Sequence, residues 1–242
     1  MNKKFLIGTF TLNTCPNVTE IISKNMDYVI IDREHGPHDF NNANILNKII
    51  KKNCLSLIRA SHLNRIEIQK CLDLNPDGIL IPQISSYSDA KKALSYSFFS
   101  PKGTRGLSPY TSGFNYNHHD SDNKKKIINK KIFLGLLIEG AEGLTALNKI
   151  CSKFSKEISL IYFGLYDFTS SLGLKPNWKD SRVKKAVKKI VDVCKKKNIK
   201  VGSIARDLKE ISFLKKMGIN FICYQNDTGI IHEAFSQIKS KR

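Results

Sequence analysis

Charged side chains follow three apolar runs of the sequence, at the points where those runs stop. They are Asp32 and His35 after Tyr28–Ile31, Glu139 after Ile132–Ile138, and Asp167 after Leu160–Gly164. Short apolar runs that are rich in β-branched residues and stop at a glycine or a charge are typical of buried parallel strands. In barrels of alternating strands and helices, the carboxyl ends of the strands form the active-site face. The spacing therefore predicts an active site assembled from distant parts of the chain.

Glu139 and Asp167 are the first candidates for chemistry. Two carboxylates at the ends of successive strands can bind one divalent cation through oxygen and leave positions open for water and substrate. Alternatively, each acid only stabilises the positive end of the following helix dipole. Their occurrence together with a third acidic strand end favours the metal site.

Asp32, His35 and Arg59 form the second group. A carboxylate three residues before a histidine can orient the imidazole and increase its basicity as a general base. The alternative is a histidine that only caps a loop. Arg59 ends another apolar run, where a guanidinium can bind a carboxylate or stabilise an enolate oxygen through paired donors. An ion pair from Arg59 to Asp32 or Glu34 is compatible with that role.

The positions of the lysines exclude one type of aldolase chemistry. An aldolase that forms a Schiff base needs a lysine at a strand end inside the barrel. No lysine of this chain ends a predicted strand. Any carbanion stabilisation should therefore come from a metal ion.

Eight apolar segments predict strands that alternate with helices. The predicted strands are Phe5–Phe10, Tyr28–Asp32, Leu55–Arg59, Gly78–Pro82, Ile132–Ile138, Leu160–Phe163, Lys200–Ile204 and Phe221–Tyr224. Apolar periodicity predicts helices over Phe40–Lys52, Ile66–Leu74 and Ser181–Lys197, with Asn64 as a cap of the second. This alternation predicts an α/β fold, a TIM (β/α)8 barrel, in one domain that covers residues 1–242.

The segment Ser100–Asn129 does not fit the alternation. Its prolines and glycines predict a long loop, and long loops in compact domains are usually functional or mobile. His118 and His119 lie in a polar part of this segment, so we expect both to be exposed to solvent.

The formal net charge of +19 raises the question of nucleic-acid binding. The excess is almost entirely lysine on predicted outer helices, without an arginine-rich stripe between aromatic residues, so we expect no nucleic-acid partner. The positive field would still attract anionic substrates. Polar residues interrupt the apolar stretch after Met1–Lys4, which argues against a signal peptide, and no run is long enough to span a bilayer. Six cysteines without a C-x-x-C pair indicate reduced thiols in a cytoplasmic protein.

In order and spacing, several stretches together resemble the HpcH/HpaI family, the class II (metal-dependent) pyruvate aldolases of the phosphoenolpyruvate/pyruvate barrel type. The matching stretches are Asp32–Pro37, Ile58–Arg59, Ile68–Asp73, Gly78–Pro82, Pro101–Gly106, Ile138–Glu139 and Phe163–Asp167. The resemblance covers nearly the whole chain. It implies a TIM-barrel lyase that uses Mg²⁺, Mn²⁺ or Co²⁺. The implied reaction cleaves a 4-hydroxy-2-oxoacid to pyruvate and an aldehyde, or runs the reverse addition.

The resemblance also implies a role for each candidate residue. Glu139 and Asp167 match the metal ligands, His35 the general base, Asp32 the partner of that base, and Arg59 the arginine that contacts the pyruvate oxygens. Asp73 matches an acid that reaches the site of a neighbouring subunit, which implies a hexamer built from trimers. Where the family commonly has Gly-Pro-Ala-Asp, this chain has Gly164, Leu165 and Tyr166 before Asp167. We expect this change to alter the wall of the pyruvate pocket.

Two other functions fit the same scaffold. A biosynthetic condensing enzyme, for example a citrate-forming one, or an acyl-CoA lyase would keep the site and change the acceptor or donor. A protein of another class, with a silent site and an anionic partner on its basic surface, is argued against by the near-complete set of catalytic positions.

Overall fold

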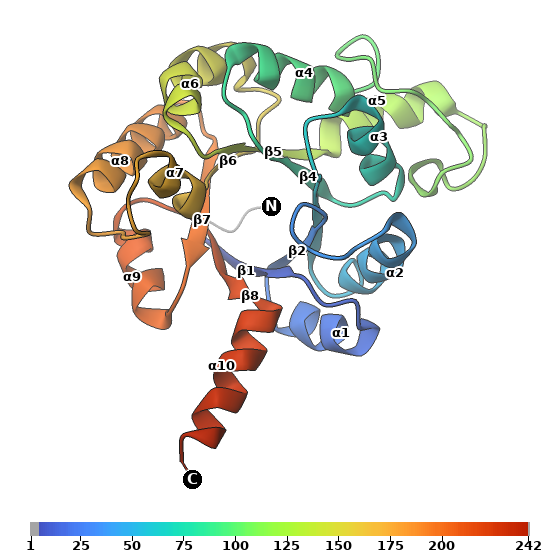
Figure 1. Cartoon of the computed structure of the whole chain (residues 1–242). Helices are drawn as coiled ribbons and strands as arrows, with labels where there is room; N and C mark the ends of the chain where they lie inside the picture. The colour runs from blue at the N-terminus through green and yellow to red at the C-terminus, as the bar shows by residue number, and fades with distance from the viewer. Residues whose placement is uncertain (1–4, 242) are drawn as a thin grey trace.

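The computed structural model describes residues 5–241, and the backbone forms a closed barrel of eight parallel strands that follow one another in chain order (Figure 1). The strands are β1 (Leu6–Thr11), β2 (Tyr28–Asp32), β3 (Leu55–Arg59), β4 (Gly78–Ile81), β5 (Phe133–Ile138), β6 (Leu160–Phe163), β7 (Lys200–Ala205) and β8 (Phe221–Asn226). This arrangement confirms the predicted α/β class and TIM barrel. The predicted single domain spans residues 1–242, of which residues 1–4 and 242 lie outside the described residues. The segment Met1–Lys4, which precedes the stretch considered as a signal peptide, is therefore not described.

Helices connect the strands and cover most of the outside of the barrel (Figure 1). They are α1 (Pro16–Asn25), α2 (Phe40–Ile50), α3 (Arg65–Asp73), α4 (Tyr87–Ser97), α5 (Ser121–Lys131), α6 (Ala141–Phe154), α7 (Leu165–Ser171), α8 (Ser181–Lys195), α9 (Leu208–Lys216) and α10 (Asp227–Lys239). The three predicted helices are confirmed as α2, α3 and α8, and Asn64 caps α3 by accepting hydrogen bonds from two amides of its first turn. Within residues 5–241, no helix combines the length and apolar character that crossing a membrane requires.

Side chains on each strand alternate between the barrel interior and the surrounding helices. On β2, Tyr28 and Ile30 belong to the cluster inside the barrel, whereas Val29 and Ile31 pack in the cluster between the strands and the helices. Because the inner cluster is buried, the barrel is a packed core and not a pore. Because of this alternation, the last inward-facing residue of a strand lies at the open carboxyl end of the barrel.

The predicted loop Ser100–Asn129 is wrong in its last part, because α5 begins at Ser121. This helix has no buried residue, so the sequence lacks the apolar stripe that would reveal it. It is held from the side, because the Asn129 side chain exchanges two hydrogen bonds of 2.9 Å with the backbone of Phe99. His118, which precedes the helix, is exposed as predicted.

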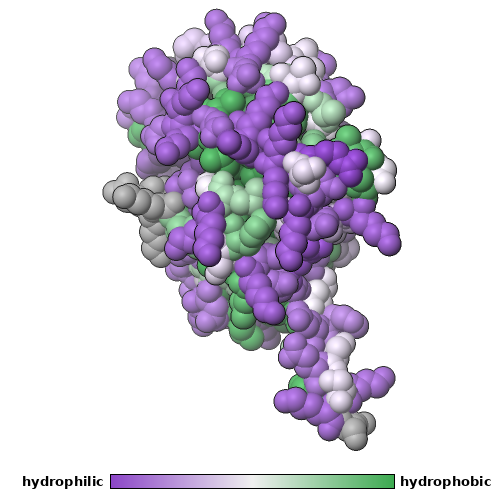
Figure 2. Space-filling view, turned by 90° about the vertical axis from the view of Figure 1, so that its left-hand side faces the viewer, coloured by the Kyte–Doolittle hydropathy of each residue, from purple (hydrophilic) through white to green (hydrophobic). Residues whose placement is uncertain are grey.

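The last helix, α10, does not lie along the barrel as the other outer helices do. It starts at β8 and projects away from the body of the molecule (Figures 1 and 2). Its apolar side chains Phe235 and Ile238 are 69% and 65% exposed. The sequence predicts strands that alternate with helices on the outside of the barrel, and α10 departs from this arrangement.

Candidate active site

The alternation along the strands brings two of the predicted residues to the same end of the barrel. Ile30 on β2 and Leu57 on β3 belong to the inner cluster. Asp32 and Arg59 each lie two residues further along their strands, and therefore also on the inward side. The two residues are direct partners in the β2–β3 register. Their side chains consequently meet at the carboxyl end of the barrel.

Arg59 is the centre of a buried ion-pair cluster. Its Nε and Nη2 atoms donate hydrogen bonds of 2.9 and 2.6 Å to Oδ1 and Oδ2 of Asp32. Its Nη1 atom lies 2.9 Å from Oε2 of Glu34, and the ring of Phe10 lies 4.7 Å from its Cζ atom. Burial alone lowers the pKa of Arg59, but the hydrogen bond and the charge of Asp32, with the charge of Glu34, raise it above its ordinary value. The guanidinium is a fixed cation that keeps one N–H on each of Nη1 and Nη2 for a ligand.

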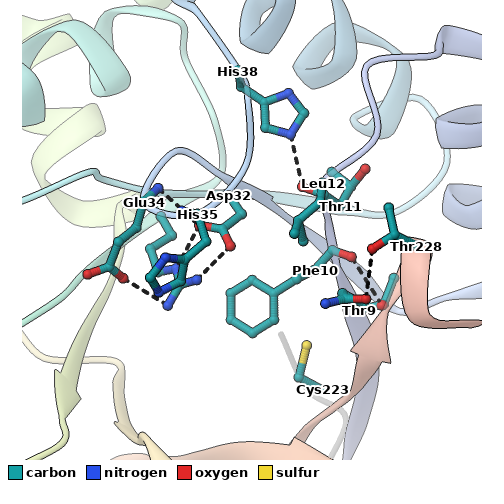
Figure 3. A network of polar contacts seen from close by, with 12 residues as sticks. Thr9, Phe10, Thr11, Leu12, Asp32, Glu34, His35, His38, Cys223 and Thr228 are labelled. Carbon is teal, nitrogen blue, oxygen red and sulfur yellow. Dashed lines mark hydrogen bonds and ion pairs between the residues drawn. The ribbon is translucent and has the colours of Figure 1, made fainter. Parts of the chain in front are cut away.

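His35 lies directly beside this cluster, with Asp32, Glu34 and Phe10 as neighbours (Figure 3). The Oδ1 atom of Asp32 accepts hydrogen bonds from the backbone amides of Glu34 and His35, at 3.0 and 3.2 Å. The exposed imidazole of His35 has no hydrogen-bond partner within residues 5–241. In this structure Asp32 therefore fixes the backbone of His35 and leaves the imidazole accessible to a ligand.

The rest of the loop that carries His35 is anchored to its neighbours. Arg33 binds Glu67 on α3 with an Nε–Oε1 distance of 3.0 Å, and its Nη1 atom donates a 2.6 Å hydrogen bond to the carbonyl oxygen of His38. The buried imidazole of His38 lies 2.9 Å from the carbonyl oxygen of Thr11 on β1 (Figure 3). Burial raises the pKa of Glu67, but the hydrogen bonds from Arg33 and a backbone amide bring it below its ordinary value. These contacts hold the loop between β1 and α3.

Glu139 and Asp167 border two adjoining cavities at the carboxyl end of the barrel. The inner cavity, of about 290 Å³, includes Phe10 and lies in the mouth of the barrel. The outer cavity, of about 330 Å³, includes Gln83 and lies outside the mouth. His35 borders both cavities as well. The three residues that the sequence predicts as metal ligands and general base thus lie where the two cavities meet.

Glu139 carries an unfavourable charge in this setting. Burial raises its pKa to about 7, a hydrogen bond from the Gln83 amide opposes the rise, and the negative charges of Glu34 and Asp167 add to it. A bound cation would offset this repulsion. Gly164 leaves room for the carboxylate, since a Cβ atom at this glycine would lie 2.8 Å from Cβ and 3.2 Å from Oε2 of Glu139.

The donor set fits a hard divalent cation. Residues 5–241 contain no group of three or more His, Cys, Asp or Glu residues that could hold a metal. Glu139 and Asp167, which border the same two cavities, can supply two carboxylates, and the remaining positions would belong to substrate and water. Such a partial set is usual for Mg²⁺, which is often bound through one or two carboxylates.

The residues between Gly164 and Asp167 form the first turn of α7, a helix that the sequence did not predict. Leu165 is buried and Tyr166 is 47% exposed. Both border the inner cavity. Their contact with substrate remains a prediction.

Asp73 lies away from these residues, at the carboxyl end of α3. Its carboxylate pairs with Arg105, with an Nη2–Oδ1 distance of 2.8 Å. Arg105 borders a separate cavity of about 630 Å³, which also includes the first residues of β3 and β5, Leu55 and Phe133. Asp73 is therefore at the amino end of the barrel, and its predicted role depends on a neighbouring subunit.

The sequence pattern does not mark Phe10, Tyr162 and Gln83 as site residues. Phe10 and Tyr162 face inward on β1 and β6 and border the inner cavity. Their places in the two strands were predictable, but a single aromatic residue in a strand is usually core. Gln83 borders the outer cavity, and no sequence signal marks it, because a glutamine after a strand is usually an ordinary loop residue.

The closed barrel is of the (β/α)8 class, in which active centres lie at the carboxyl ends of the strands. Residues 7–233 match the HpcH/HpaI aldolase/citrate lyase family, and the chain belongs to that family. Membership identifies it as a carbon–carbon lyase of the aldolase type.

Similar proteins agree with this assignment. The chain is 24% identical over 230 residues to a hydroxypyruvate/pyruvate aldolase of Sagittula stellata, which covers 94% of this chain and 89% of that protein. A crystal structure of an HpcH/HpaI family protein from Burkholderia cenocepacia has a TM-score of 0.90 at 19% identity, with 98% and 94% of the two chains covered. The citrate synthase SbnG has a TM-score of 0.86 at 22% identity, with 98% and 93% covered. At these identities the two structures support the fold.

Proposed function

We propose that this chain is a class II, metal-dependent aldolase that cleaves a 4-hydroxy-2-oxoacid to pyruvate and an aldehyde, or catalyses the reverse addition. The observation that carries the proposal is the meeting of Glu139, Asp167 and His35 at the junction of two cavities, with the Arg59 cluster beside them. The resident metal in this proposal is Mg²⁺, Mn²⁺ or Co²⁺, held by Glu139 and Asp167. When bound, it would act as a Lewis acid on the 2-oxo group and stabilise the enolate charge.

Arg59 and its partners orient the pyruvate part of the substrate in this proposal. The two N–H groups of Arg59 that Asp32 and Glu34 leave unused donate to substrate oxygens, and they stabilise negative charge as the C3–C4 bond breaks. Asp32 holds the guanidinium in one orientation. The apolar side chains Phe10 and Leu165 line the inner cavity, which suits the methyl group of pyruvate.

His35 acts as the general base. Its imidazole is exposed, borders both cavities and is free of internal hydrogen bonds, so it can take the proton of the 4-hydroxyl group directly or through water. In the direction of addition it returns that proton to the new hydroxyl group. The aldehyde part of the substrate then occupies the outer cavity, beside Gln83.

We further propose that the chain works as a homo-oligomer, for which the family resemblance implies a hexamer. Phe235 on α10 is 69% exposed, and Leu208 on α9 and Ile21 on α1, the helices that flank it, are 72% and 64% exposed (Figure 1). A second copy packed on α10 would bury these apolar side chains. Assembly is also what Asp73 requires in order to reach another subunit's site.

We also propose the predicted cytoplasmic setting, with which the six free cysteines agree. The chain is proposed to form one domain over residues 1–242.

A cleavage assay tests the proposed reaction. Pyruvate release would be measured from a panel of 4-hydroxy-2-oxoacids with Mg²⁺, Mn²⁺ or Co²⁺, and again after treatment with EDTA. We expect pyruvate release that EDTA abolishes and a divalent metal restores. Release that needs oxaloacetate or an acyl-CoA thioester would instead identify a condensing enzyme or acyl-CoA lyase. Tight binding of polyanions without any turnover would identify a silent binding protein.

A further inference from the structure

Gln83 has an unusual backbone conformation at the edge of the site. It follows β4 after Pro82, and its φ angle is +58°. Residues other than glycine carry a steric cost in this left-handed region, and such strain tends to persist where the surrounding structure uses it. Asparagine or glycine would form the same turn more easily. The presence of a glutamine therefore calls for an explanation from its side chain.

Both ends of Gln83 contact carboxylates of the site. Its backbone amide donates a 2.6 Å hydrogen bond to Oε1 of Glu139. Its side-chain amide donates a 3.2 Å hydrogen bond to Oε1 of Glu34, and the other oxygen of Glu34 lies 2.9 Å from Nη1 of Arg59. One residue thus contacts the metal-ligand side and the Arg59 side of the site at the same time.

The contacts continue without a break to the loop of the general base. Arg59 donates two hydrogen bonds to Asp32, and Asp32 accepts from the backbone amide of His35 at 3.2 Å. Glu34 accepts the hydrogen bond from the Gln83 side chain. Burial raises the pKa of Glu34, and the positive charge of Arg59 opposes that rise. A neutral donor at position 83 satisfies one oxygen of this carboxylate without competing for the charge of Arg59.

We propose that Gln83 is a positioning residue that couples the metal-ligand half of the site, through Glu34, to the half formed by Arg59, Asp32 and His35. This inference rests on the proposed aldolase function. The backbone amide of Gln83 sets the orientation of Glu139. Its carboxamide keeps Glu34 directed at Arg59, and therefore keeps the guanidinium in place for the enolate oxygen.

Two variants separate the backbone from the side chain. Gln83→Gly keeps the backbone amide and removes the steric cost of the positive φ, whereas Gln83→Met keeps the length of the side chain and removes its donor. We expect kcat to fall about tenfold in both variants, the size of one hydrogen bond to a charged group. We expect the KM for substrate and the Kd for Mn²⁺, measured by calorimetry, to change less than about threefold, because the backbone contact to Glu139 remains.

The matched control is Asn198→Gly. Asn198 has a φ angle of +56° and is exposed on the turn before β7, away from the site. Its backbone relief is smaller than that of Gln83→Gly, because asparagine tolerates a positive φ better than glutamine, so it sets a lower limit on the change in Tm that comes from the positive φ alone. Its kcat should equal that of the parent protein.

A double-mutant cycle and a spectroscopic signal decide the proposal. In a Glu34→Ala background, Gln83→Met should change kcat less than about twofold, because the partner is already gone. The ¹⁵Nε–¹Hε signal of Arg59 should shift in Gln83→Met and should not shift further when Glu34→Ala is present. An unchanged Arg59 signal, or equal kcat losses in both backgrounds, would overturn the coupling. If the parent protein lacks metal-dependent activity, the aldolase proposal fails, and the Arg59 signal still decides the role of Gln83.

Discussion

Asp32 and Arg59 are neighbours across the β2–β3 ladder, and their side chains are joined by two hydrogen bonds of 2.9 and 2.6 Å. Only 2% of the Asp32 side chain and 12% of the Arg59 side chain are exposed. The pair therefore has two consequences. It fixes a cation at the mouth of the barrel. It also leaves Oδ1 of Asp32 able to accept a hydrogen bond from the backbone amide of His35.

Replacing Arg59 by lysine should separate charge from geometry. Arg59→Lys keeps a cation but cannot form the paired contact with Asp32, so kcat/KM should fall roughly 100-fold. Arg59→Met leaves Asp32 and Glu34 buried without a cation, and should lower the free energy of unfolding by about 3 kcal/mol. Steady-state kinetics and urea unfolding check both effects. A lysine variant with the parent kcat/KM would show that the fork geometry has no role.

A methyl group at Gly164 should disturb Glu139 directly. The added Cβ would lie 2.8 Å from Cβ of Glu139, closer than side chains tolerate. We expect Gly164→Ala to weaken Mn²⁺ binding at least about tenfold in calorimetry, with a loss of about 1 kcal/mol in unfolding free energy. Gly113→Ala is the control, because its nearest contact would be an ordinary 3.7 Å. Equal Mn²⁺ affinity in the two variants would contradict the assignment of Glu139 as a ligand.

The Arg33–Glu67 pair should make stability depend on acid pH. The pKa of Glu67 is lower in the folded protein than its ordinary value of 4.5. The stability it contributes is therefore present above that value and is lost as the pH falls through the folded pKa. Glu67→Gln should lose less stability than the parent protein between about pH 5 and about pH 3. Chemical unfolding of both proteins across this range, with EDTA present, measures the difference, and parallel curves would refute it.

Charges placed on α10 should change the oligomeric state. Phe235→Glu combined with Ile238→Glu puts two carboxylates on the apolar side chains that a second copy would cover. We expect smaller particles in sedimentation velocity, whereas Asn123→Glu, a charge on the exposed polar helix α5, should leave the assembly unchanged. A parent protein that sediments as a monomer would contradict the oligomer proposal.

The sequence predicts the barrel because its strands are apolar and end at charges, as at Asp32 and Glu139. The same alternation explains why these residues meet at one end. From the sequence, an ion pair of Arg59 with Asp32 or Glu34 was one possibility. The structure shows that Arg59 pairs with both carboxylates.

Other features depend on tertiary structure and leave no local signal. The positive φ of Gln83 is imposed by its surroundings, since glutamine does not favour it. Helix α5 has no apolar face. The direction of α10 is set where the helix meets β1 and β8, which the periodicity of one helix does not specify.

The most direct test is exchange of the pyruvate methyl protons for deuterium, followed by NMR in D₂O with Mg²⁺ or Mn²⁺. Exchange needs an enolate and does not require knowledge of the aldehyde. Matched samples would contain EDTA, or the Glu139→Gln variant, which keeps the shape of the side chain and removes its charge. We expect exchange that requires both the metal and Glu139. Exchange that persists with EDTA or in Glu139→Gln, or no exchange with any metal, would contradict a metal-stabilised pyruvate enolate at this site.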